Sequence, residues 1–369
     1  MDHFARRRDL LARSVAEEGL DACLISSPIN VSYLTGFSGD SSFLIVGRKD
    51  SLLVSDARFT EQLAEECPGL ETYIRPPTQR PLQAIGRSLD KLGHHSVGFE
   101  SAHLTVAEFD GLREQLPAVN WKAGAERVER LRLTKDAVEL AAIREAIVIA
   151  EKAFAAFCAM LGGDDTEQEL CDALEGFLRK AGGKGSSFPP IVAAGPRAAL
   201  PHAPPTAQRV GGAELLLVDW GASGRFYKSD LTRVLDTRRK GPVPGNGDKL
   251  EQVHELVARA QAAAIRAVRP GVKGHDVDAA ARQVIADAGF GAYFGHGLGH
   301  GIGLQVHEGP ALRPNSEAVL APGMVVTIEP GVYLPGWGGV RIEDDVLVTP
   351  DGCEVLSHLS RELVPVFRS

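Results

Sequence analysis

The sequence is poor in cysteine, has no long apolar run and carries no surplus of positive charge, and each shortage excludes a class of protein. Its five cysteines are scattered and form no CxxC pair, which argues against a disulfide framework or a cysteine-based metal site. Apolar stretches such as 214–218 and 323–328 have the length of a strand and cannot span a bilayer. A formal net charge of −8 argues against nucleic acid or an anionic membrane surface as the main partner.

Length and composition predict a two-domain globular protein. At 369 residues the chain exceeds the usual size of one compact core, and its 44% hydrophobic and 24% charged residues are ordinary for a globular protein. Residues 1–20 start with basic side chains but lack a continuous apolar segment, so they do not resemble a secretion signal. We therefore expect a cytoplasmic protein with reduced thiols.

The N-terminal third alternates between helical and strand-like patterns. Helices are expected at 3–18, 57–66 and 79–92, and strands at 21–26, 42–46, 51–54, 70–74 and 96–99. This alternation is typical of a small α/β domain with helices packed on a sheet, and it contains no chemical motif. Because the composition changes near 125–133, we expect domains at 1–130 and 131–369.

The C-terminal domain begins with two helices. An Ala-rich segment without Gly or Pro predicts a helix over 134–160, with Thr134 as its cap. A second helix over 166–181 starts with a capping-box pattern at Thr166. Further helices are expected at 248–268 and 274–288. Strands and glycine-rich connections make up the rest, so the fold class is α/β (α+β).

Four carboxylates and one imidazole recur in a fixed order along this domain. They are Asp219, Asp230, His300, Glu329 and Glu343, in the segments VDWGA, SDLTR, GHGLGHGIGLQVHE, TIEPG and RIEDD. Burying one unpaired carboxylate is costly, whereas divalent cations would neutralise the group. Oxygen-rich ligation with one histidine suits a pair of Mn²⁺, Co²⁺, Fe²⁺ or Zn²⁺ ions that share a hydroxide. The pattern predicts two-metal hydrolysis.

The first two carboxylates lie on a predicted hairpin. Residues 214–235 contain two strand-like runs joined across 221–224. Near-opposite residues on one face of a hairpin lie about 5 Å apart, so Asp219 and Asp230 could reach the same ion. Taken singly, Asp219 could merely end a strand, and Asp230 could pair with Arg233.

Four histidines accompany the carboxylates. The segment 294–310 places His296, His300 and His307 among closely spaced glycines, which oppose a helix and exclude a helical zinc pair. Glycine lets backbone approach a ligand closely, as in the wall of a catalytic cleft; the alternative is a turn with incidental histidines. His202, in a stiff proline-rich segment, would ordinarily be a loop residue, but near metals it could donate a hydrogen bond to substrate.

The last two carboxylates interrupt apolar runs. Glu329 ends one run and Glu343 lies inside another, where an unpaired glutamate would be unfavourable. Arg341 lies two residues before Glu343 and hence on the same face of a strand. It could support a bridging carboxylate or bind a substrate carboxylate. Alternatively, it could form a surface ion pair with Asp344 or Asp345.

In their order and amino-acid sequence, six segments resemble those of the pita-bread-fold metallopeptidases. They are PHAPP, VDWGA, SDLTRV, HGLGHGIGLQVHE, TIEPGVY and VRIEDD, within about 200–345. The chain is most similar to the proline-specific branch, which comprises Xaa-Pro dipeptidase (prolidase) and Xaa-Pro aminopeptidase (aminopeptidase P). A creatinase-like N-terminal domain before the pita-bread catalytic domain extends the resemblance over nearly the whole chain.

The resemblance implies a metal assignment. Asp219 would bind the first metal, Asp230 and Glu343 would bridge both, and His300 and Glu329 would complete the second. The two ions per subunit would be Mn²⁺ or Co²⁺, sometimes Zn²⁺ or Fe²⁺. Glu329 would be the general base that takes a proton from water and helps pass it to the leaving nitrogen.

The resemblance also implies roles for residues that bind no metal. His202, His296 and His307 fall on the histidines that position the scissile carbonyl and the substrate and assist proton transfer. His307 or His202 would help one metal to stabilise the oxyanion. Tyr333 and Arg341 fall on a further active-site tyrosine and arginine.

The implied reaction is hydrolysis of the Xaa-Pro bond in dipeptides or short peptides with proline in the second position, by a homodimer. Because the proline nitrogen has no N–H, a pocket shaped for its ring can exclude ordinary peptides. The alternative is an aminopeptidase P, which releases the N-terminal residue of longer peptides. A length of 369 residues favours the prolidase-like enzyme.

Three other members of the fold are weaker alternatives. Methionine aminopeptidases share the five ligands but generally lack a large N-terminal domain. Creatinase shares the fold without the metal ligands. A catalytically inactive binding scaffold is opposed by the complete ligand set and the three accompanying histidines, His202, His296 and His307.

Overall fold

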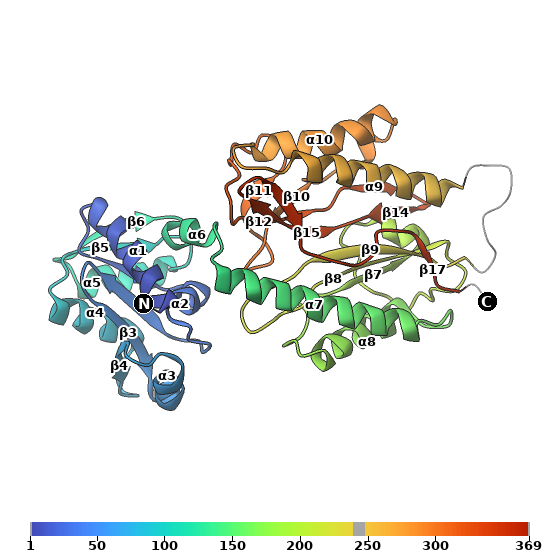
Figure 1. The fold of residues 1–369 in the computed structure, drawn as a ribbon. Coiled ribbons are helices and arrows are strands. Elements are labelled where there is room, and N and C mark those ends of the chain that lie inside the picture. The colour runs from blue at the N-terminus through green and yellow to red at the C-terminus, as the bar shows by residue number, and fades with distance from the viewer. Residues whose placement is uncertain (1, 239–247, 368–369) are drawn as a thin grey trace. The chain divides into compact units, whose positions relative to one another are not determined.

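The computed structural model describes residues 2–238 and 248–367 of the chain. These fold as two compact units, which we call the N-terminal unit, Met1–Arg132, and the C-terminal unit, Leu133–Ser369 (Figure 1). Each unit has its own hydrophobic core. Within the described ranges, none of the helices has both the length and the hydropathy that crossing a bilayer requires.

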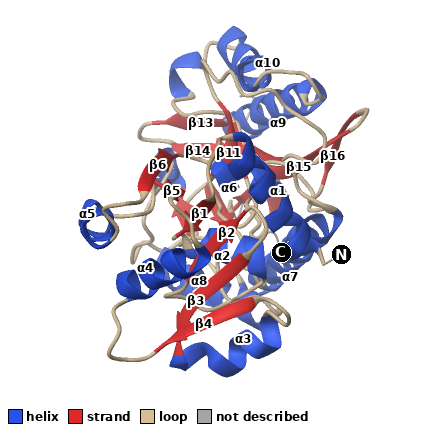
Figure 2. Cartoon of the chain, turned by 90° about the vertical axis from the view of Figure 1, so that its left-hand side faces the viewer, coloured by secondary structure: helices blue, strands red, loops and turns tan. Residues whose placement is uncertain are grey.

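The N-terminal unit is built on a mixed six-stranded sheet with helices packed against it (Figure 2). Its strands are β1 Ala22–Ile25, β2 Phe43–Gly47, β3 Ser51–Asp56, β4 Glu71–Arg75, β5 Ser96–Glu100 and β6 Asn120–Gly124, in the order β4-β3-β2-β1-β5-β6. Its helices are α1 His3–Glu17, α2 Pro28–Thr35, η1 Ala57–Phe59, α3 Thr60–Glu66, α4 Pro81–Leu92, α5 Val106–Gln115 and α6 Arg127–Arg132. Strand β2 is antiparallel to both neighbours, and the other pairs are parallel.

The expected alternation of helices and strands is confirmed in this unit, and its cause is burial of the sheet. Ala22 and Leu24 share a core with Ile85 and Leu89 of α4, while α1 packs against β1 and β2. Successive strand residues point to opposite faces, so the fully buried β1 is apolar throughout.

The C-terminal unit contains two sheets and a hairpin between two pairs of helices. One sheet has the order β17-β9-β8-β7, the other has the order β11-β10-β12-β15-β16, and β13 pairs with β14. The strands are β7 Ile191–Ala194, β8 Leu215–Trp220, β9 Leu231–Asp236, β10 Gly299–Gly301, β11 Glu308–Leu312, β12 Val325–Ile328, β13 Gly331–Leu334, β14 Gly338–Arg341, β15 Asp344–Thr349, β16 Gly352–Val355 and β17 Val364–Pro365. The helices are α7 Ala137–Met160, α8 Glu167–Lys180, η2 Gly195–Ala199, α9 Lys249–Ala267, α10 Gly274–Asp287 and η3 Gly291–Tyr293.

Strand β8 lies between these two helical layers (Figure 1). Leu216 and Val218 belong to the core under α7 and α8. Leu215 and Leu217 belong to the other core, which β12, β15, α9 and α10 also line. Asp219 has the parity of Leu215 and Leu217, so the strand directs its carboxylate into the layer between the two sheets.

The sequence predicted the capping residues of the first two helices of this unit, wrongly for α7 and correctly for α8. Asp136, and not Thr134, caps α7: its side chain accepts from the N–H of Glu139, and Glu139 accepts from the N–H of Asp136. This reciprocal pair satisfies two orphan donors, so the helix starts later than expected. At α8, Thr166 and Glu169 form the expected capping box.

Candidate metal centre

The hairpin β8–β9 brings Asp219 and Asp230 to one face. Asp219 lies opposite Thr232, and Asp230 lies two residues before Thr232, directly ahead of β9. The predicted hairpin is confirmed, but its reversal lies at 224–227, where the N–H of Gly224 donates to Tyr227 O at 2.9 Å, and not across 221–224. The antiparallel pairing continues beyond Trp220, so the two carboxylates are diagonal neighbours instead of directly opposite ones.

The other three candidate ligands come from strands of the second sheet or from their ends. His300 lies in β10, and Glu329 directly follows β12, with its N–H bonded to Leu298 O at 2.9 Å. Glu343 lies between β14 and β15 and bridges to β9 through its N–H, which donates to Thr232 O at 3.2 Å. The segment 294–310 forms no α-helix, so the prediction against a helical histidine pair is confirmed.

These elements bring the predicted ligands together. We call this group of five residues the ligand cluster: Asp219, Asp230, His300, Glu329 and Glu343. Single ligand atoms of Asp230, His300 and Glu343 all lie within 4.8 Å of one another. His300 Nε2 is 3.7 Å from Asp230 Oδ2 and 3.4 Å from Glu329 Oε1. Asp219 lies to the side, where Arg341 Nη2 pairs with its Oδ2.

The electrostatics of the ligand cluster match a cation site. Burial raises the pKa of Asp219, raises the pKa of Glu329 to about 8, and raises the pKa of Asp230 and Glu343 well above their usual range. Repulsion from neighbouring carboxylates adds to the pKa shifts of Glu329, Asp230 and Glu343. Asp219 Oδ1 is buried and accepts no hydrogen bond from the described residues. Buried carboxylates with open acceptor positions suit divalent cations, which would reverse these shifts.

His300 is prepared as a neutral ligand. Burial lowers its pKa to about 4, so the imidazole carries no charge at neutral pH. Its Nδ1 lies 3.1 Å from Gly301 O, which fits an Nδ1–H donor. Nε2 therefore keeps its lone pair on the side of Asp230 and Glu329.

Arg341 is a buried support of two candidate ligands. One guanidinium nitrogen, Nη2, pairs with Asp219, and Nη1 donates to the hydroxyl of Tyr333 at 2.7 Å. Its Nε donates to Thr232 Oγ1 at 3.1 Å, and that hydroxyl donates to Glu343 Oε2 at 2.6 Å. Thr232 was not singled out from the sequence, although its place opposite Asp219 in a hairpin was a usable signal.

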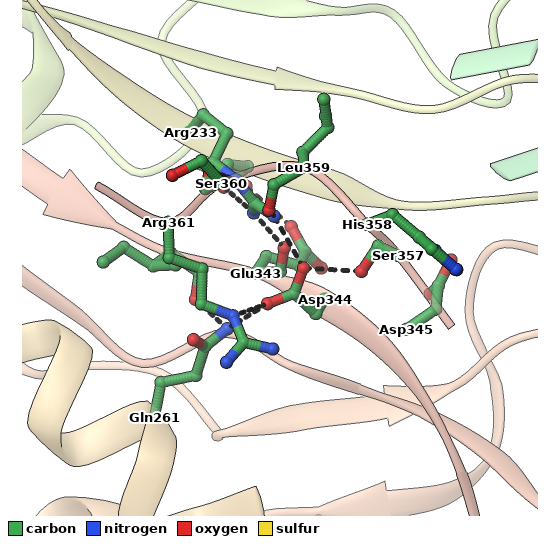
Figure 3. Close-up of polar contacts among 12 residues, drawn as sticks. Arg233, Gln261, Glu343, Asp344, Asp345, Ser357, His358, Leu359, Ser360 and Arg361 are labelled. Atoms are coloured by element: carbon green, nitrogen blue, oxygen red, sulfur yellow. Dashed lines mark hydrogen bonds and ion pairs between the residues drawn. The ribbon is translucent and has the colours of Figure 1, made fainter. Parts of the chain in front are cut away.

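The ion pairs that the sequence offered as alternatives to a metal site are wrong. Arg233 pairs with Asp344 at 2.7 Å, not with Asp230 (Figure 3). Arg341 does not lie at the surface, since it is 3% exposed. Asp345 is buried as well, and its Oδ2 accepts from the backbone N–H of Asp230 at 3.2 Å. The sequence did not identify Asp345 as a support of Asp230.

His296 is linked to Arg341 through Tyr333. The Tyr333 hydroxyl lies 2.9 Å from His296 Nε2, and His296 Nδ1 lies 2.7 Å from Gly297 O. Burial lowers the pKa of His296 to about 4, with a further lowering by Arg341. Burial raises the pKa of Tyr333 to about 12. At neutral pH the hydroxyl therefore keeps its proton and donates a hydrogen bond to Nε2 of the neutral imidazole.

His202 and His307 are exposed, in contrast to the ligand cluster. The ring of His307 meets that of His300 edge to face, with centroids 4.3 Å apart. Both exposed histidines oppose the rise of the pKa of Asp219 that burial causes, so both lie within electrostatic range of that carboxylate. They can contact a bound molecule without being metal ligands.

Comparisons with known proteins agree with this arrangement. Residues 141–350 match the model of metallopeptidase family M24, and residues 7–134 match that of the creatinase/prolidase N-terminal domain. An Xaa-Pro dipeptidase of Pyrococcus horikoshii is 33% identical over 99% of this chain and 100% of its own length. Among solved structures, an Xaa-Pro dipeptidase from Bacillus anthracis has a TM-score of 0.92 at 34% identity and covers 98% of this chain and 99% of its own. An X-Pro aminopeptidase from Thermotoga maritima has a TM-score of 0.88 at 33% identity, with coverages of 95% and 99%.

Proposed function

The chain belongs to metallopeptidase family M24, and we propose that it is a prolidase-like exopeptidase that uses two divalent metal ions to hydrolyse the Xaa-Pro bond of dipeptides. The expected fold class, a creatinase-like N-terminal domain followed by a pita-bread catalytic domain, is confirmed. The observation that carries the proposal is the convergence of Asp230, His300 and Glu343 within 4.8 Å in a buried acidic cluster. An inactive scaffold has no use for such a cluster, because unneutralised carboxylates destabilise a core.

We assign the metals to the ligand cluster as the resemblance implies. Asp219 would hold the first ion, His300 and Glu329 the second, and Asp230 and Glu343 would bridge them. Bound cations would supply charge neutralisation and a water of lowered pKa. We propose Mn²⁺ as the native ion, since carboxylate oxygens predominate among the donors.

Glu329 is the residue that we propose as general base. Its side chain keeps 17% of its surface exposed, against 7% for Asp230, so Glu329 is the more open to water. Thr327 Oγ1 donates to Glu329 Oε1 at 3.3 Å and holds the carboxylate toward His300. The carboxylate would accept a proton from water and then pass it to the proline nitrogen.

The exposed histidines and the buried chain from Arg341 would handle the substrate. His202 and His307 would donate to the scissile carbonyl and the oxyanion, because both are accessible and lie near Asp219. His296 is held by Tyr333 and would position the substrate as a neutral imidazole. Arg341 is committed to Asp219 and Tyr333, so it would act on the site chiefly through these partners.

The proposal also covers the domain bounds, the oligomeric state and the location of the protein. We propose domains at 1–130 and 131–369, which the compact units Met1–Arg132 and Leu133–Ser369 support. A homodimer and a cytoplasmic location follow from the resemblance, and size-exclusion chromatography with light scattering tests the first. The aminopeptidase alternative is not favoured, because several relatives that match nearly the full chain are Xaa-Pro dipeptidases, and dipeptidase and prolidase structures also match it over nearly its full length.

The experiment that tests the function compares two substrates with Mn²⁺. An Ala-Pro dipeptide and an Ala-Pro-Ala tripeptide are offered at equal concentrations to the Mn²⁺-loaded protein and to the chelator-treated protein. We expect metal-dependent hydrolysis of the dipeptide and little of the tripeptide. A comparable rate of hydrolysis of the tripeptide would contradict the proposed dipeptidase specificity. Hydrolysis of neither peptide would contradict the proposal that the protein is a peptidase.

A further inference from the structure

Asp344 is a fully buried carboxylate beside the ligand cluster, and four donors saturate it (Figure 3). Its Oδ1 accepts from Arg233 Nη2 at 2.7 Å and from Ser357 Oγ at 2.5 Å. Its Oδ2 accepts from Gln261 Nε2 at 2.9 Å and from Arg361 Nε at 2.6 Å. An ionised carboxylate offers about four acceptor positions, so this group has little capacity left for a metal. It serves as the fixed centre of a network.

Arg233 uses all of its donors in this network. A guanidinium carries five N–H groups in a rigid fork. They reach Ser360 O at 2.8 Å, Thr232 O at 2.9 Å, Glu343 O at 2.6 Å, Asp344 Oδ1 at 2.7 Å and Leu359 O at 3.0 Å. One side chain therefore joins β9, the junction of β14 and β15, and the C-terminal segment 357–361.

This junction carries both candidate bridging ligands. The carbonyl of Glu343 accepts from Arg233, while its carboxylate accepts from Thr232, the residue before Arg233 in β9. Asp230 directly precedes the same strand. Two bonds to adjacent residues of one strand set the position and the direction of Glu343 relative to Asp230.

Gln261 of α9 extends the network to the second glutamate. Its Nε2 lies 3.1 Å from Ile328 O and 3.2 Å from Ile342 O, besides its contact with Asp344. Ile328 precedes Glu329, and Ile342 precedes Glu343. The amide thus holds together the two chain segments from which these glutamates project.

We propose that Arg233 and Gln261, joined through Asp344, are positioning residues for the metal centre. They fix the backbone beside Glu343 and Glu329. The segment 357–361 supports this network through two backbone carbonyls, which accept from Arg233, and through the Ser357 hydroxyl and the Arg361 guanidinium, which donate to Asp344. The inference rests on the proposed function, since it takes both glutamates as metal ligands. It adds residues that touch neither metal nor substrate but set the geometry on which metal affinity depends.

The test replaces Arg233 by lysine, which keeps the charge and loses the fork. Apo protein is compared for its melting temperature, for Mn²⁺ affinity by calorimetry and, after loading with Co²⁺, for its visible absorption spectrum. We expect Arg233→Lys to weaken Mn²⁺ binding by roughly 10-fold or more and to change the Co²⁺ spectrum. Gln261→Met, a change of similar volume, is the second variant, and we expect it to weaken Mn²⁺ binding as well. It decides the test if Arg233→Lys does not fold.

The matched control is Arg197→Lys, because Arg197 forms another ion pair with a buried carboxylate, Glu167, in the same unit. We expect it to lower the melting temperature and to leave Mn²⁺ affinity and the Co²⁺ spectrum unchanged. Unchanged affinity and spectrum in Arg233→Lys, or in Gln261→Met where the first does not fold, would overturn the proposal and leave a purely structural role. Failure of the unaltered protein to bind metal would instead contradict the proposed function.

Discussion

Thr232 Oγ1 donates a 2.6 Å hydrogen bond to Oε2 of Glu343 and at the same time accepts one from Arg341 Nε. This hydroxyl therefore links the buried guanidinium of Arg341 to the carboxylate of Glu343, a candidate bridging ligand. It leaves Glu343 Oε1 free of this restraint and directs the carboxylate by one oxygen. The first prediction follows from this link.

Thr232→Val keeps the shape of the side chain and removes the hydroxyl. We expect Mn²⁺ affinity to fall about 10-fold to 100-fold, because Glu343 loses the donor that orients it. Calorimetric titration of apo protein measures this, with the melting temperature of the apo form as the control for folding. Unchanged affinity would show that the hydroxyl does not orient the ligand.

Glu329→Gln removes the proposed base and conserves the size of the side chain. We expect kcat for Ala-Pro to fall by about 10²-fold to 10⁴-fold or more, since general-base catalysis is lost along with one ligand charge. The fold should persist, because burial raises the pKa of Glu329 to about 8 and a neutral group costs less in this environment. Retained turnover in the variant would identify another group as the base.

His202→Ala truncates an exposed histidine that no strand of the ligand cluster holds. We expect a loss of kcat with stoichiometric metal still bound, because the side chain would act on the substrate carbonyl. Steady-state kinetics and elemental analysis on the same sample separate these effects. Loss of metal would assign His202 to the metal centre instead.

His254, in α9, gives a pH dependence that does not involve the metal ligands directly. Burial, followed by repulsion from Arg233, lowers its pKa from 6.5 to about 4 in the folded protein. The neutral form is favoured in the fold, so its contribution to stability is complete above pH 6.5 and is lost as the pH falls toward 4, a change of about 3 kcal/mol.

We expect His254→Gln to unfold with a weaker dependence on pH between 6.5 and 4 than the unaltered protein. Thermal unfolding of both apo proteins across this range measures the difference, in which contributions from the carboxylates largely cancel. Parallel curves for the two proteins would contradict the assignment.

Local patterns in the sequence were enough for much of the fold. The capping box at Thr166 and the hairpin around Asp219 depend on neighbours in the chain, so both could be predicted. Helix α2 was missed because most of its residues, from Asn30 to Thr35, are buried, which removes the amphipathic signal of a surface helix. Its start at Pro28 was the remaining signal.

The candidate site shows the same limit. The order of the ligands could be read from the chain, because each lies in a distinctive short segment. The contact between Arg233 and Asp344, and that between Asp345 and Asp230, depend on how β9 meets β15 across more than a hundred residues of sequence. Charge alone favoured partners nearer in the sequence for Arg233 and Arg341, and those pairings were wrong.

Metal content tests the central claim most directly. Protein loaded with Mn²⁺ and freed of unbound ions is analysed for its elements, beside the variants Asp230→Asn and Glu343→Gln. We predict two Mn²⁺ per chain in the unaltered protein and fewer than one in each variant, with all three still folded. A folded, unaltered protein that retains no metal would contradict the account.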